Sequence, residues 1–486
     1  MRIPLLSLAV LVVGTSTSLA HAAGGLFSGN KGAHASGRAG AFTARADDLT
    51  APHYNPAGLS RLKAPLLQVG DRISYNQQEY TRAATTDWNA AGAPVVSFEP
   101  VRNGKPWWGL DPFVGFGTRL GLEHWAFALA VYGPPGVAVQ DFPVNGGQRY
   151  MMVNREALIL NYTATAAWSP NDKFGLGASF QWIDVSLLKY SLVLDGNPIG
   201  TDARPVSSGL DMLATTEGSD HFTPNAVLGA WVRLSPQLEL GIAGQVIPAN
   251  IVTKSKLEVE PLGSGFTTGV ELSRNYRPAD DVELTIPLPL SARAGIRYVK
   301  AQDQQEKFDV ELDLTYETWS RVDRFKLDSN GMVAEFIGQR LDVGVIELQK
   351  QWQDTFSVHL GSDVAVSPDL LTLRGGVFFE SAVAQRSYMN VDFVSGPQLG
   401  GALGASVFAG PVEVAVAYNF RQQTKVSLAE NDAQVYQTVP FSRCEAPYTD
   451  PATCNEHYYG QPAPAVNAGE YRAHSHVLAM DALVRF

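Results

Sequence analysis

Apolar and polar residues alternate along most of this chain, a pattern that is typical of β-strands with one apolar and one polar face. From Phe308 to Glu317 the even positions are apolar, and the odd positions carry acidic residues or threonine. Residues 412–421 and 158–168 show the same period of two. No stretch has 18 consecutive apolar residues, so the sequence predicts strands and no transmembrane helix.

The alternating segments and the turn residues between them predict about fourteen strands. Short connections such as residues 169–172, 235–237 and 367–369 begin with Ser-Pro, in which proline presets φ for a turn. Short turns at one rim and long loops at the other are typical of a transmembrane antiparallel β-barrel, and we predict this all-β fold. The expected strands lie near residues 65–76, 110–119, 124–134, 157–168, 174–190, 225–235, 238–248, 290–300, 308–319, 355–366, 371–380, 401–409, 410–421 and 475–486.

Aromatic residues lie near the ends of the expected strands, where they would form girdles at the two membrane interfaces. The chain also ends on an aromatic residue, Phe486, directly after an alternating strand. This ending resembles the terminal signal that outer-membrane barrels present to the barrel assembly machinery. We therefore expect a barrel of the Gram-negative outer membrane that contacts outer-membrane lipid, lipopolysaccharide and the assembly machinery.

The composition agrees with a barrel in lipid. Only 17% of the residues are charged, against about 25% in a typical soluble domain, while the mean hydropathy is near neutral at −0.06. Lipid-facing strand positions cannot carry charges cheaply, and alternation spreads the apolar surface over one face of each strand. The net charge of −11 argues against binding to nucleic acid, because a phosphate backbone selects a basic surface.

The N-terminus has the form of a secretory signal. Met1-Arg2 is followed by an apolar core over residues 3–13 and by Ala20-His21-Ala22. An apolar core of roughly 11 residues is too short to span the membrane, so we predict a signal peptide over residues 1–22 that is cleaved after Ala22. The mature chain then begins in an oxidising compartment.

Residues 23–64 do not alternate and are rich in glycine and alanine. A lumen of about fourteen strands stays open unless something fills it, so we predict a hatch (plug) over residues 23–64 inside a barrel of residues 65–486. The charges of this hatch would anchor it to the wall, because buried charges must be paired. The anchoring residues are Arg38, Arg45, Asp47 and Asp48, and the expected wall partners are Asp309, Glu311, Asp313, Glu317 and Arg374.

Motifs of the hatch resemble those of a known family. Residues 37–42 read Gly-Arg-Ala-Gly-Ala-Phe, residues 46–48 read Ala-Asp-Asp, and residues 54–59 read Tyr-Asn-Pro-Ala-Gly-Leu. They are similar to the hatch signature of the FadL/TodX (OMPP1) family of outer-membrane transporters for hydrophobic compounds. Later segments resemble the family in the same order, namely residues 287–291, 316–320, 352–355 and 371–376.

The resemblance implies a fourteen-stranded barrel with an N-terminal hatch. It also implies passive uptake of long-chain fatty acids or other hydrocarbon ligands, without energy coupling and without a cofactor. Substrate would be caught in apolar loop pockets and passed to a site beside the hatch. It would then leave sideways into the membrane through a gap made by a kinked third strand.

Two candidate sites follow from the motifs. Asn55, Pro56, Ala57 and Gly58 match the hatch motif of the family, and they form either a movable element or a turn that only locks the plug. The expected third strand is followed by Gly133, Pro134, Pro135 and Gly136. Proline removes ladder donors, so this segment either opens a lateral gap in the wall or ends the strand at the rim.

Candidate substrate contacts lie in the long connections over residues 191–224 and 249–289. Their apolar side chains would pack on substrate or on one another. They include Leu210, Met212, Leu213, Phe222, Leu257, Leu262, Phe266, Val270 and Leu272. Cys444 and Cys454 lie in the last long loop, where an oxidising compartment favours a disulfide over a free redox pair.

Functions of other classes compete with transport. An outer-membrane enzyme of the lipase kind needs a Ser–His pair at the rim, and the chain has no Gly-x-Ser-x-Gly motif. A general porin would lack the plug, whereas long loops would also suit a surface adhesin. We expect no metal site, because the pair His474 and His476 offers too few ligands.

Overall fold

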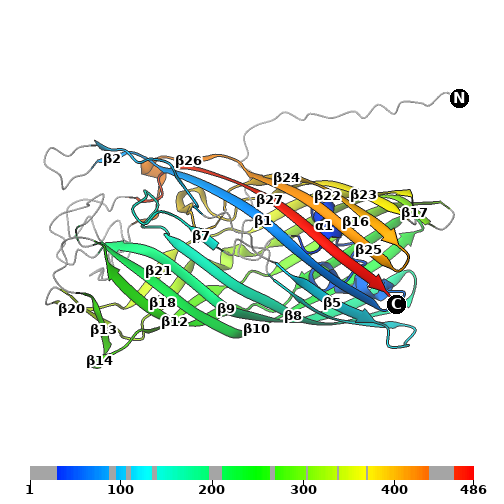
Figure 1. The fold of residues 1–486 in the computed structure, drawn as a ribbon, viewed down its shortest axis with the longest axis horizontal. Coiled ribbons are helices and arrows are strands. Elements are labelled where there is room, and N and C mark those ends of the chain that lie inside the picture. The colour runs from blue at the N-terminus through cyan, green and yellow to red at the C-terminus, as the bar shows by residue number, and fades with distance from the viewer. Residues whose placement is uncertain are drawn as a thin grey trace.

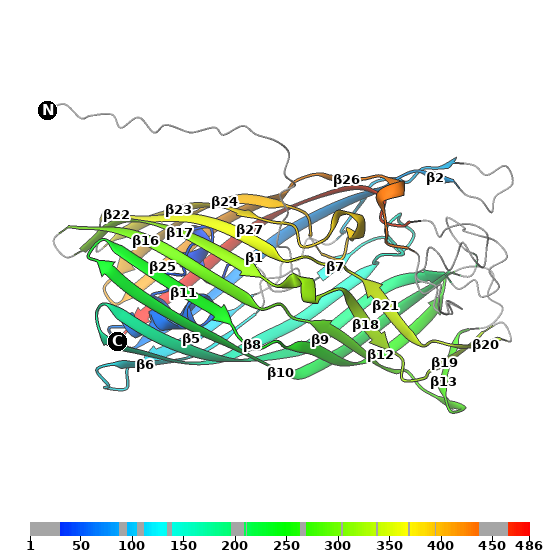
Figure 2. The same ribbon diagram turned by 180° about the vertical axis from the view of Figure 1, so that it is seen from behind.

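The strands close into one antiparallel barrel, which Figures 1 and 2 show from opposite sides. The computed structural model describes residues 30–86, 95–104, 111–133, 139–195, 209, 211–262, 269–302, 305–336, 339–367, 370–393, 395–436 and 465–486. Within them the closed barrel has 14 strands. These are β1 (Leu66–Arg82), β5 (Phe113–Thr118), β6 (Trp125–Tyr132), β8 (Asn154–Asn171), β9 (Phe174–Asp195), β10 (Asp211–Ser235), β11 (Leu238–Gln245), β16 (Ser291–Gln302), β17 (Gln305–Glu317), β22 (Thr355–Ser367), β23 (Leu371–Glu380), β24 (Gln398–Ala409), β25 (Val412–Gln423) and β27 (Gly469–Arg485).

Each of the expected strands overlaps one of these barrel strands, so the predicted fold is confirmed. The barrel closes where β1 pairs with β27 from Leu66–Arg485 to Arg82–Gly469. As expected, the polar positions of the alternating strands face the lumen and the apolar positions face the lipid. On β17 the acidic residues Asp309, Glu311 and Asp313 are buried in the lumen, while Leu312, Leu314 and Tyr316 are exposed on the lipid face.

The strands extend further than the sequence predicted at the rim that carries the long loops, which we call extracellular. There β9 and β10 continue beyond the expected bounds, and four more strands prolong the sheet in the order β10-β12-β15-β18-β21. Parts of the long connections therefore pair as strands, because period-two alternation also persists above the membrane. These four strands are β12 (Asn250–Pro261), β15 (Asp281–Pro287), β18 (Arg324–Asp328) and β21 (Val345–Gln349).

Smaller elements complete the described structure. A four-stranded sheet projects from the extracellular end, seen at the left of Figure 1. No helix of the described residues is both long enough and apolar enough to cross a membrane. The remaining strands are β2 (Thr85–Thr86), β3 (Val95–Val96), β4 (Val101–Arg102), β7 (Val139–Asp141), β13 (Glu271–Arg274), β14 (Arg277–Pro278), β19 (Val333–Phe336), β20 (Gln339–Asp342) and β26 (Val426–Leu428), and the short loop helices are η2 (Trp319–Arg321), η3 (Arg386–Tyr388) and η4 (Glu430–Asp432).

The segment before β1 lies inside the barrel. It forms α1 (Ala33–Gly37), α2 (Ala51–Tyr54) and η1 (Pro56–Arg61). In Figure 1 α1 lies inside the barrel, surrounded by the strands, towards the end where the C-terminus is labelled. Nearly every residue from 30 to 62 is buried, so this segment, called the hatch below, fills the lumen near the short-turn, periplasmic rim.

Candidate functional site

The hatch touches the wall backbone to backbone. At several lumen-facing glycines of the wall, an added Cβ would lie 2.1–2.6 Å from atoms of the hatch, closer than real Cβ contacts allow. We call these residues the glycine ring: Gly177 of β9, Gly229 of β10, Gly241 of β11, Gly361 of β22 and Gly376 of β23. Their hatch partners include the backbone of Pro56, Thr43 and Arg38. The ring makes a socket into which the hatch fits only because the wall carries no side chain there.

The hatch motif begins a 3-10 helix. The Asn55 Oδ1 accepts a hydrogen bond from the Ala57 N at 3.1 Å and so caps η1. Its Nδ2 donates to the Thr43 O at 2.9 Å and to the Ala230 O of β10 at 3.0 Å. Pro56 occupies the first helical turn, where its missing N–H is tolerated. An added Cβ on Gly58 would lie 2.1 Å from the Ala46 O. This geometry joins the motif to two other parts of the hatch and to the wall.

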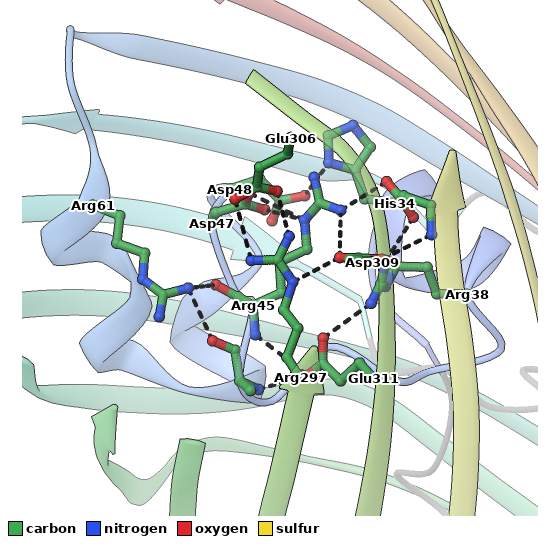
Figure 3. A network of polar contacts seen from close by, with 12 residues as sticks. His34, Arg38, Arg45, Asp47, Asp48, Arg61, Arg297, Glu306, Asp309 and Glu311 are labelled. Atoms are coloured by element: carbon green, nitrogen blue, oxygen red, sulfur yellow. Dashed lines mark hydrogen bonds and ion pairs between the residues drawn. The ribbon is translucent and has the colours of Figure 1, made fainter. Parts of the chain in front are cut away.

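Arginines of the hatch meet carboxylates of the wall. The Arg38 guanidinium donates to Asp309 at 2.7 Å, to Asp363 at 2.7 Å and to Glu311 at 3.0 Å. Arg45 contacts Asp363 at 2.8 Å and Asp309 at 3.2 Å (Figure 3). Several of these groups are fully buried, so removal of one partner would leave a charge uncompensated, at a cost of about 3–5 kcal/mol.

The two predicted acidic anchors are held within the hatch itself. Asp47 pairs with Arg45 at 3.1 Å. The Asp48 Oδ1 accepts from the Thr50 N at 2.8 Å, and its Oδ2 lies 3.0 Å from the His34 Nδ1. Their expected contacts with wall charges are therefore replaced by contacts with neighbouring hatch residues.

His34 is an anchor that the sequence did not reveal. Its Nε2 lies 2.7 Å from Glu413 on β25. Burial and the nearby Arg374 guanidinium favour the neutral imidazole, but the contacts with Glu413 and Asp48 outweigh them and raise the pKa of His34 to about 9. At neutral pH the imidazolium therefore joins the hatch to β25.

Two described ladders pair with β8 in different registers beside the third barrel strand. The β6 ladder runs up to Tyr132–Asn161, and the β7 ladder includes Val139–Glu156. Gly133 N donates to the Pro112 O at 3.3 Å, while the hatch residue Lys31 donates from its Nζ to the Gly133 O. We call the place in the wall between these two described ladders the window. Gly133 lies within the wall and not at the extracellular rim, because β7 continues above it.

A second irregularity lies at the same height. The register of β8 against β9 shifts between Leu158 and Ile159, at positions that fall between the two paired stretches of β8. The predicted residues Pro134, Pro135 and Gly136 lie outside the described residues.

An apolar cavity lies in the extracellular half of the barrel. It measures about 640 Å³ including the space open to solvent. Its walls come from β8, β9, β10, β12, β15, β18 and β21, with Leu192, Leu257, Leu284, Phe325 and Ile346 among its lining residues. Arg155 is the cationic residue among them, and its guanidinium carbon lies 4.1 Å from the centre of the Phe393 ring. The lining of the cavity is therefore mostly apolar, with Arg155 among its few polar residues.

Most of the chain matches one protein family. The family model described as "Outer membrane protein transport protein (OMPP1/FadL/TodX)" matches residues 13–452. The chain belongs to this family. It is accordingly an outer-membrane β-barrel of a family that transports hydrophobic compounds. A search of the curated proteins finds no match.

Solved structures of FadL/TodX-type barrels have the same fold. A Pseudomonas aeruginosa FadL homologue superposes with a TM-score of 0.73 at 15% identity, covering 96% of this chain and 100% of that chain. The P. putida toluene transporter TodX gives 0.62 at 14% identity, covering 94% and 98%. The Ralstonia pickettii toluene transporter TbuX gives 0.57 at 15% identity, again covering 94% and 98%.

Only some of the substrate contacts predicted from the sequence of this FadL/TodX-family chain lie at or near the apolar cavity. Leu257 lines the cavity, and Met212 is buried on the same strand face as the lining residues Ala214 and Thr216. Leu213 is half-buried against the extracellular core. Phe222 is 59% exposed and packs its ring 5.9 Å from Trp182 on the outer face, so it does not face the cavity. Leu210, Phe266, Cys444, Cys454 and the signal peptide over residues 1–22 lie outside the described residues.

Other chemistry is weakly supported in this family member. Among the described residues no group of three His, Cys, Asp or Glu side chains could hold a metal ion. The Ser357 Oγ lies 3.1 Å from the His359 Nε2, but the Nδ1 of that imidazole faces the Ala39 O and not a carboxylate. The pair is buried against the hatch and away from the rim, so it lacks both the orienting acid and the access that a lipase needs.

Proposed function

We propose that this FadL/TodX-family barrel passively takes up long-chain fatty acids or similar hydrocarbon chains and releases them sideways into the outer membrane. Three features of the lumen support the proposal: an apolar cavity at the extracellular end, a seated hatch at the periplasmic end, and a window in the wall beside the hatch. The observation that carries it is the combination of the last two, because a lumen closed below needs another exit.

The cavity supports an amphiphilic substrate. Its lining is apolar apart from Arg155, Thr216 and the hydroxyl of Tyr190. Burying an alkyl chain in such a space is favourable by about 0.8 kcal/mol per methylene. A long chain gains this free energy at many methylenes, whereas a small aromatic compound buries less apolar surface. Toluene is named for TodX and TbuX, so aromatic hydrocarbons are the competing substrate class.

The hatch is too firmly seated to leave the lumen as a whole. It contacts the glycine ring on five strands, and its arginines contact buried carboxylates. Expelling it would expose several unpaired charges, each at a cost of several kcal/mol. Sideways exit needs no such expulsion, and we place it at the window, where the register of the wall on β8 changes between the β6 and β7 ladders. The motif at Asn55, Pro56, Ala57 and Gly58 then serves mainly to lock the plug.

Uptake assays test the transport proposal. Cells with and without the gene would be given labelled palmitate and labelled toluene, and initial rates of uptake compared. We expect palmitate uptake to depend on the protein. If only toluene uptake depends on it, the substrate class is wrong; if neither does and small sugars enter instead, the channel proposal fails.

A substitution at the window tests sideways release. An added Cβ on Gly133 would lie 2.5 Å from the Asp111 Oδ1, so Gly133→Trp would place a bulky side chain at the frame of the window. We expect palmitate uptake to fall while the barrel remains assembled. The matched control is Ala164→Trp, an exposed lipid-facing position on the paired part of β8. Undiminished uptake by Gly133→Trp would argue against this exit.

A further inference from the structure

His474 and His476 lie on the outer face of the barrel, beside its seam. The seam is the junction of β27 with β1, and β25 pairs with the other side of β27 (Figure 1). The intervening residues Ala473 and Ser475 are buried towards the lumen, whereas Leu478 is 42% exposed in the same row as the histidines. The two imidazoles therefore face the membrane, and neither the hatch nor the cavity accounts for them.

The apolar row below the histidines shows their height in the membrane. His476 lies ten residues before Phe486, the residue that follows β27 at the periplasmic rim. The outward positions between these two residues are all apolar, namely Leu478, Met480, Ala482 and Val484. A tilted transmembrane strand crosses the hydrocarbon layer in about 9–11 residues. His476 therefore lies at the extracellular boundary of the hydrocarbon.

Aromatic rings from three strands surround His476 at this boundary. Its ring centre lies 5.1 Å from that of Phe420 and 6.0 Å from those of Tyr418 and Tyr75. The ring of His474 lies 5.6 Å from that of His476. Aromatic side chains gather at the level of the lipid headgroups, so this group of five residues, called the seam cluster below, agrees with the height given by the apolar row.

The seam cluster has imidazole donors to spare. The Tyr418 hydroxyl lies 2.6 Å from the His476 Nδ1. The hydroxyl can donate to Nδ1, which keeps the proton of a neutral imidazole on Nε2. Within the described part of the chain, neither this Nε2 nor a ring nitrogen of His474 has a hydrogen-bond partner. Both histidines are only half-buried, so a headgroup can reach them.

Exposed cations continue the outer face directly above the seam cluster. Arg472 is the next outward residue of β27, and it lies 3.5 Å from Glu470. Lys425 contacts the same Glu470, and Arg102 contacts Glu79 of β1 at 2.6 Å. Three cations thus stand against two carboxylates, which gives this group a net charge of +1.

These ion pairs are weak enough to be exchanged for a stronger anion. An exposed pair is worth only about 0–1 kcal/mol, whereas a guanidinium binds phosphate through two parallel charge-assisted hydrogen bonds. Glu470 is shared by Arg472 and Lys425. Arg472 can therefore turn to a phosphate without leaving Glu470 unpaired.

Two other sectors of the outer face present carboxylates near the same boundary. On β9 and β10 the His221 Nδ1 lies 2.7 Å from Asp184. Beside β17 the Tyr316 hydroxyl donates to Asp354. A carboxylate repels a phosphate, so of these three sectors the seam is the one suited to an anionic headgroup.

We infer that the outer face of the seam binds a phosphorylated glycolipid of the outer leaflet, the lipid A part of lipopolysaccharide. Arg472 and the imidazoles of His474 and His476 hold a phosphate, and the acyl chains lie along the apolar row of β27. This row favours a lipid over free phosphate, because it begins directly below the histidines. The site is separate from the lumen, so the inference goes beyond the proposed transport and does not depend on it.

Binding of lipid A to the purified protein provides the first test. The barrel in detergent, freed of lipopolysaccharide, would be titrated with lipid A and with lipid A stripped of its phosphates, and bound lipid counted by native mass spectrometry. We expect lipid A to bind at least tenfold more tightly, because only this form offers phosphate oxygens to the guanidinium and imidazoles. Inorganic phosphate and phosphatidylglycerol at equal concentration should not displace it.

Substitutions on the outer face provide the second test. Arg472→Gln should weaken lipid A binding roughly tenfold, the loss of one charge-assisted hydrogen bond, and leave binding of the dephosphorylated lipid unchanged. The matched control is Lys189→Gln, which removes an outer-face cation paired with Glu217 at 3.6 Å. His476→Gln should also weaken lipid A binding, whereas His221→Gln should not. Heat-modifiability on SDS gels confirms that each variant is an assembled barrel.

Several outcomes would overturn the lipid A site. Equal affinity for lipid A and its dephosphorylated form would show that no phosphate is recognised. Unchanged lipid A binding by assembled Arg472→Gln, or an equal loss in Lys189→Gln, would show that the seam is not the site. Displacement by inorganic phosphate or by phosphatidylglycerol would refute the assignment to lipid A. None of these results bears on uptake through the lumen.

Discussion

At the scale of single residues, the buried charges decide how the hatch is held. Arg38 alone reaches Asp309, Glu311 and Asp363, which come from two different strands of the wall. A buried network of this kind is costly to break from one side, because the buried Glu311 then loses its ion pair with Arg38.

Substitution of Arg38 should therefore destabilise the assembled barrel. We expect Arg38→Gln to cost about 3–5 kcal/mol, seen as a lower temperature for the shift from the compact to the unfolded mobility on SDS gels. The matched control is Arg102→Gln, whose exposed pair with Glu79 is worth about 0–1 kcal/mol. Equal shifts for the two variants would contradict the anchoring role.

His34 should make hatch anchoring depend on pH. Its pKa is raised from 6.5 to about 9 in the folded protein, so its contribution is fully present below pH 6.5 and is lost as the pH rises through 9. The size of the shift corresponds to about 3 kcal/mol. Thermal unfolding between pH 6 and pH 10 would be compared with that of His34→Gln. The difference in stability between the two proteins should shrink with rising pH, and a constant difference would refute the assignment.

At the scale of elements, period-two alternation was enough to predict the strands. It failed where the register changes. Phe222 belongs to the stretch of β10 in which the pairing with β9 shifts between Gly218 and Thr223, and a one-residue shift moves a side chain to the other face. For this reason a candidate substrate contact points outward.

The predicted hatch could be found from its small residues and motifs, whereas its socket could not. Gly177, Gly229 and Gly361 look in the sequence like ordinary strand glycines. Their function appears only when closure of the barrel sets which wall positions face Pro56, Asn55 and Arg38. His34 was missed for the same reason, since its wall partner Glu413 is distant in sequence.

Neighbouring glycines on β23 provide a sharp test of the glycine ring. The added Cβ of Gly376 would lie 2.5 Å from the Arg38 O, while that of Gly375 meets nothing closer than Leu403 at 3.7 Å. We expect Gly376→Leu to lower the free energy of unfolding by more than an overpacked core residue usually does, which is about 1–3 kcal/mol. Gly375→Leu should be tolerated, because its side chain would lie on the lipid face. Heat-modifiability of the purified barrels measures both. Comparable stability of the two variants would argue against a socket.

At the scale of the whole molecule, charge is separated from lipid. The lumen holds carboxylates and arginines in contact with the hatch, and the outer faces of the strands are apolar. A near-neutral mean hydropathy of −0.06 therefore averages two surfaces of opposite character within one barrel.

The seal of the lumen can be tested by electrical recording. We expect the wild-type protein in planar bilayers to show no steady ion conductance, because the hatch fills the lumen. The double variant Arg38→Gln, Arg45→Gln should show openings, since both contacts of the hatch with Asp363 of the wall are lost. Steady porin-like conductance of the wild type would contradict the hatch as a seal.

The glycine ring also constrains the order of biogenesis. Arg38 is fully buried, and its backbone lies where the ring glycines Gly361 and Gly376 leave no room for a side chain. We therefore expect that the hatch enters its socket with difficulty once the cylinder is complete. We expect the strands to wrap around a hatch that is already in place, with the seam between β1 and β27 as the point of closure. The hatch would then act during assembly as a template for the barrel, before it acts in the finished protein as a seal of the lumen.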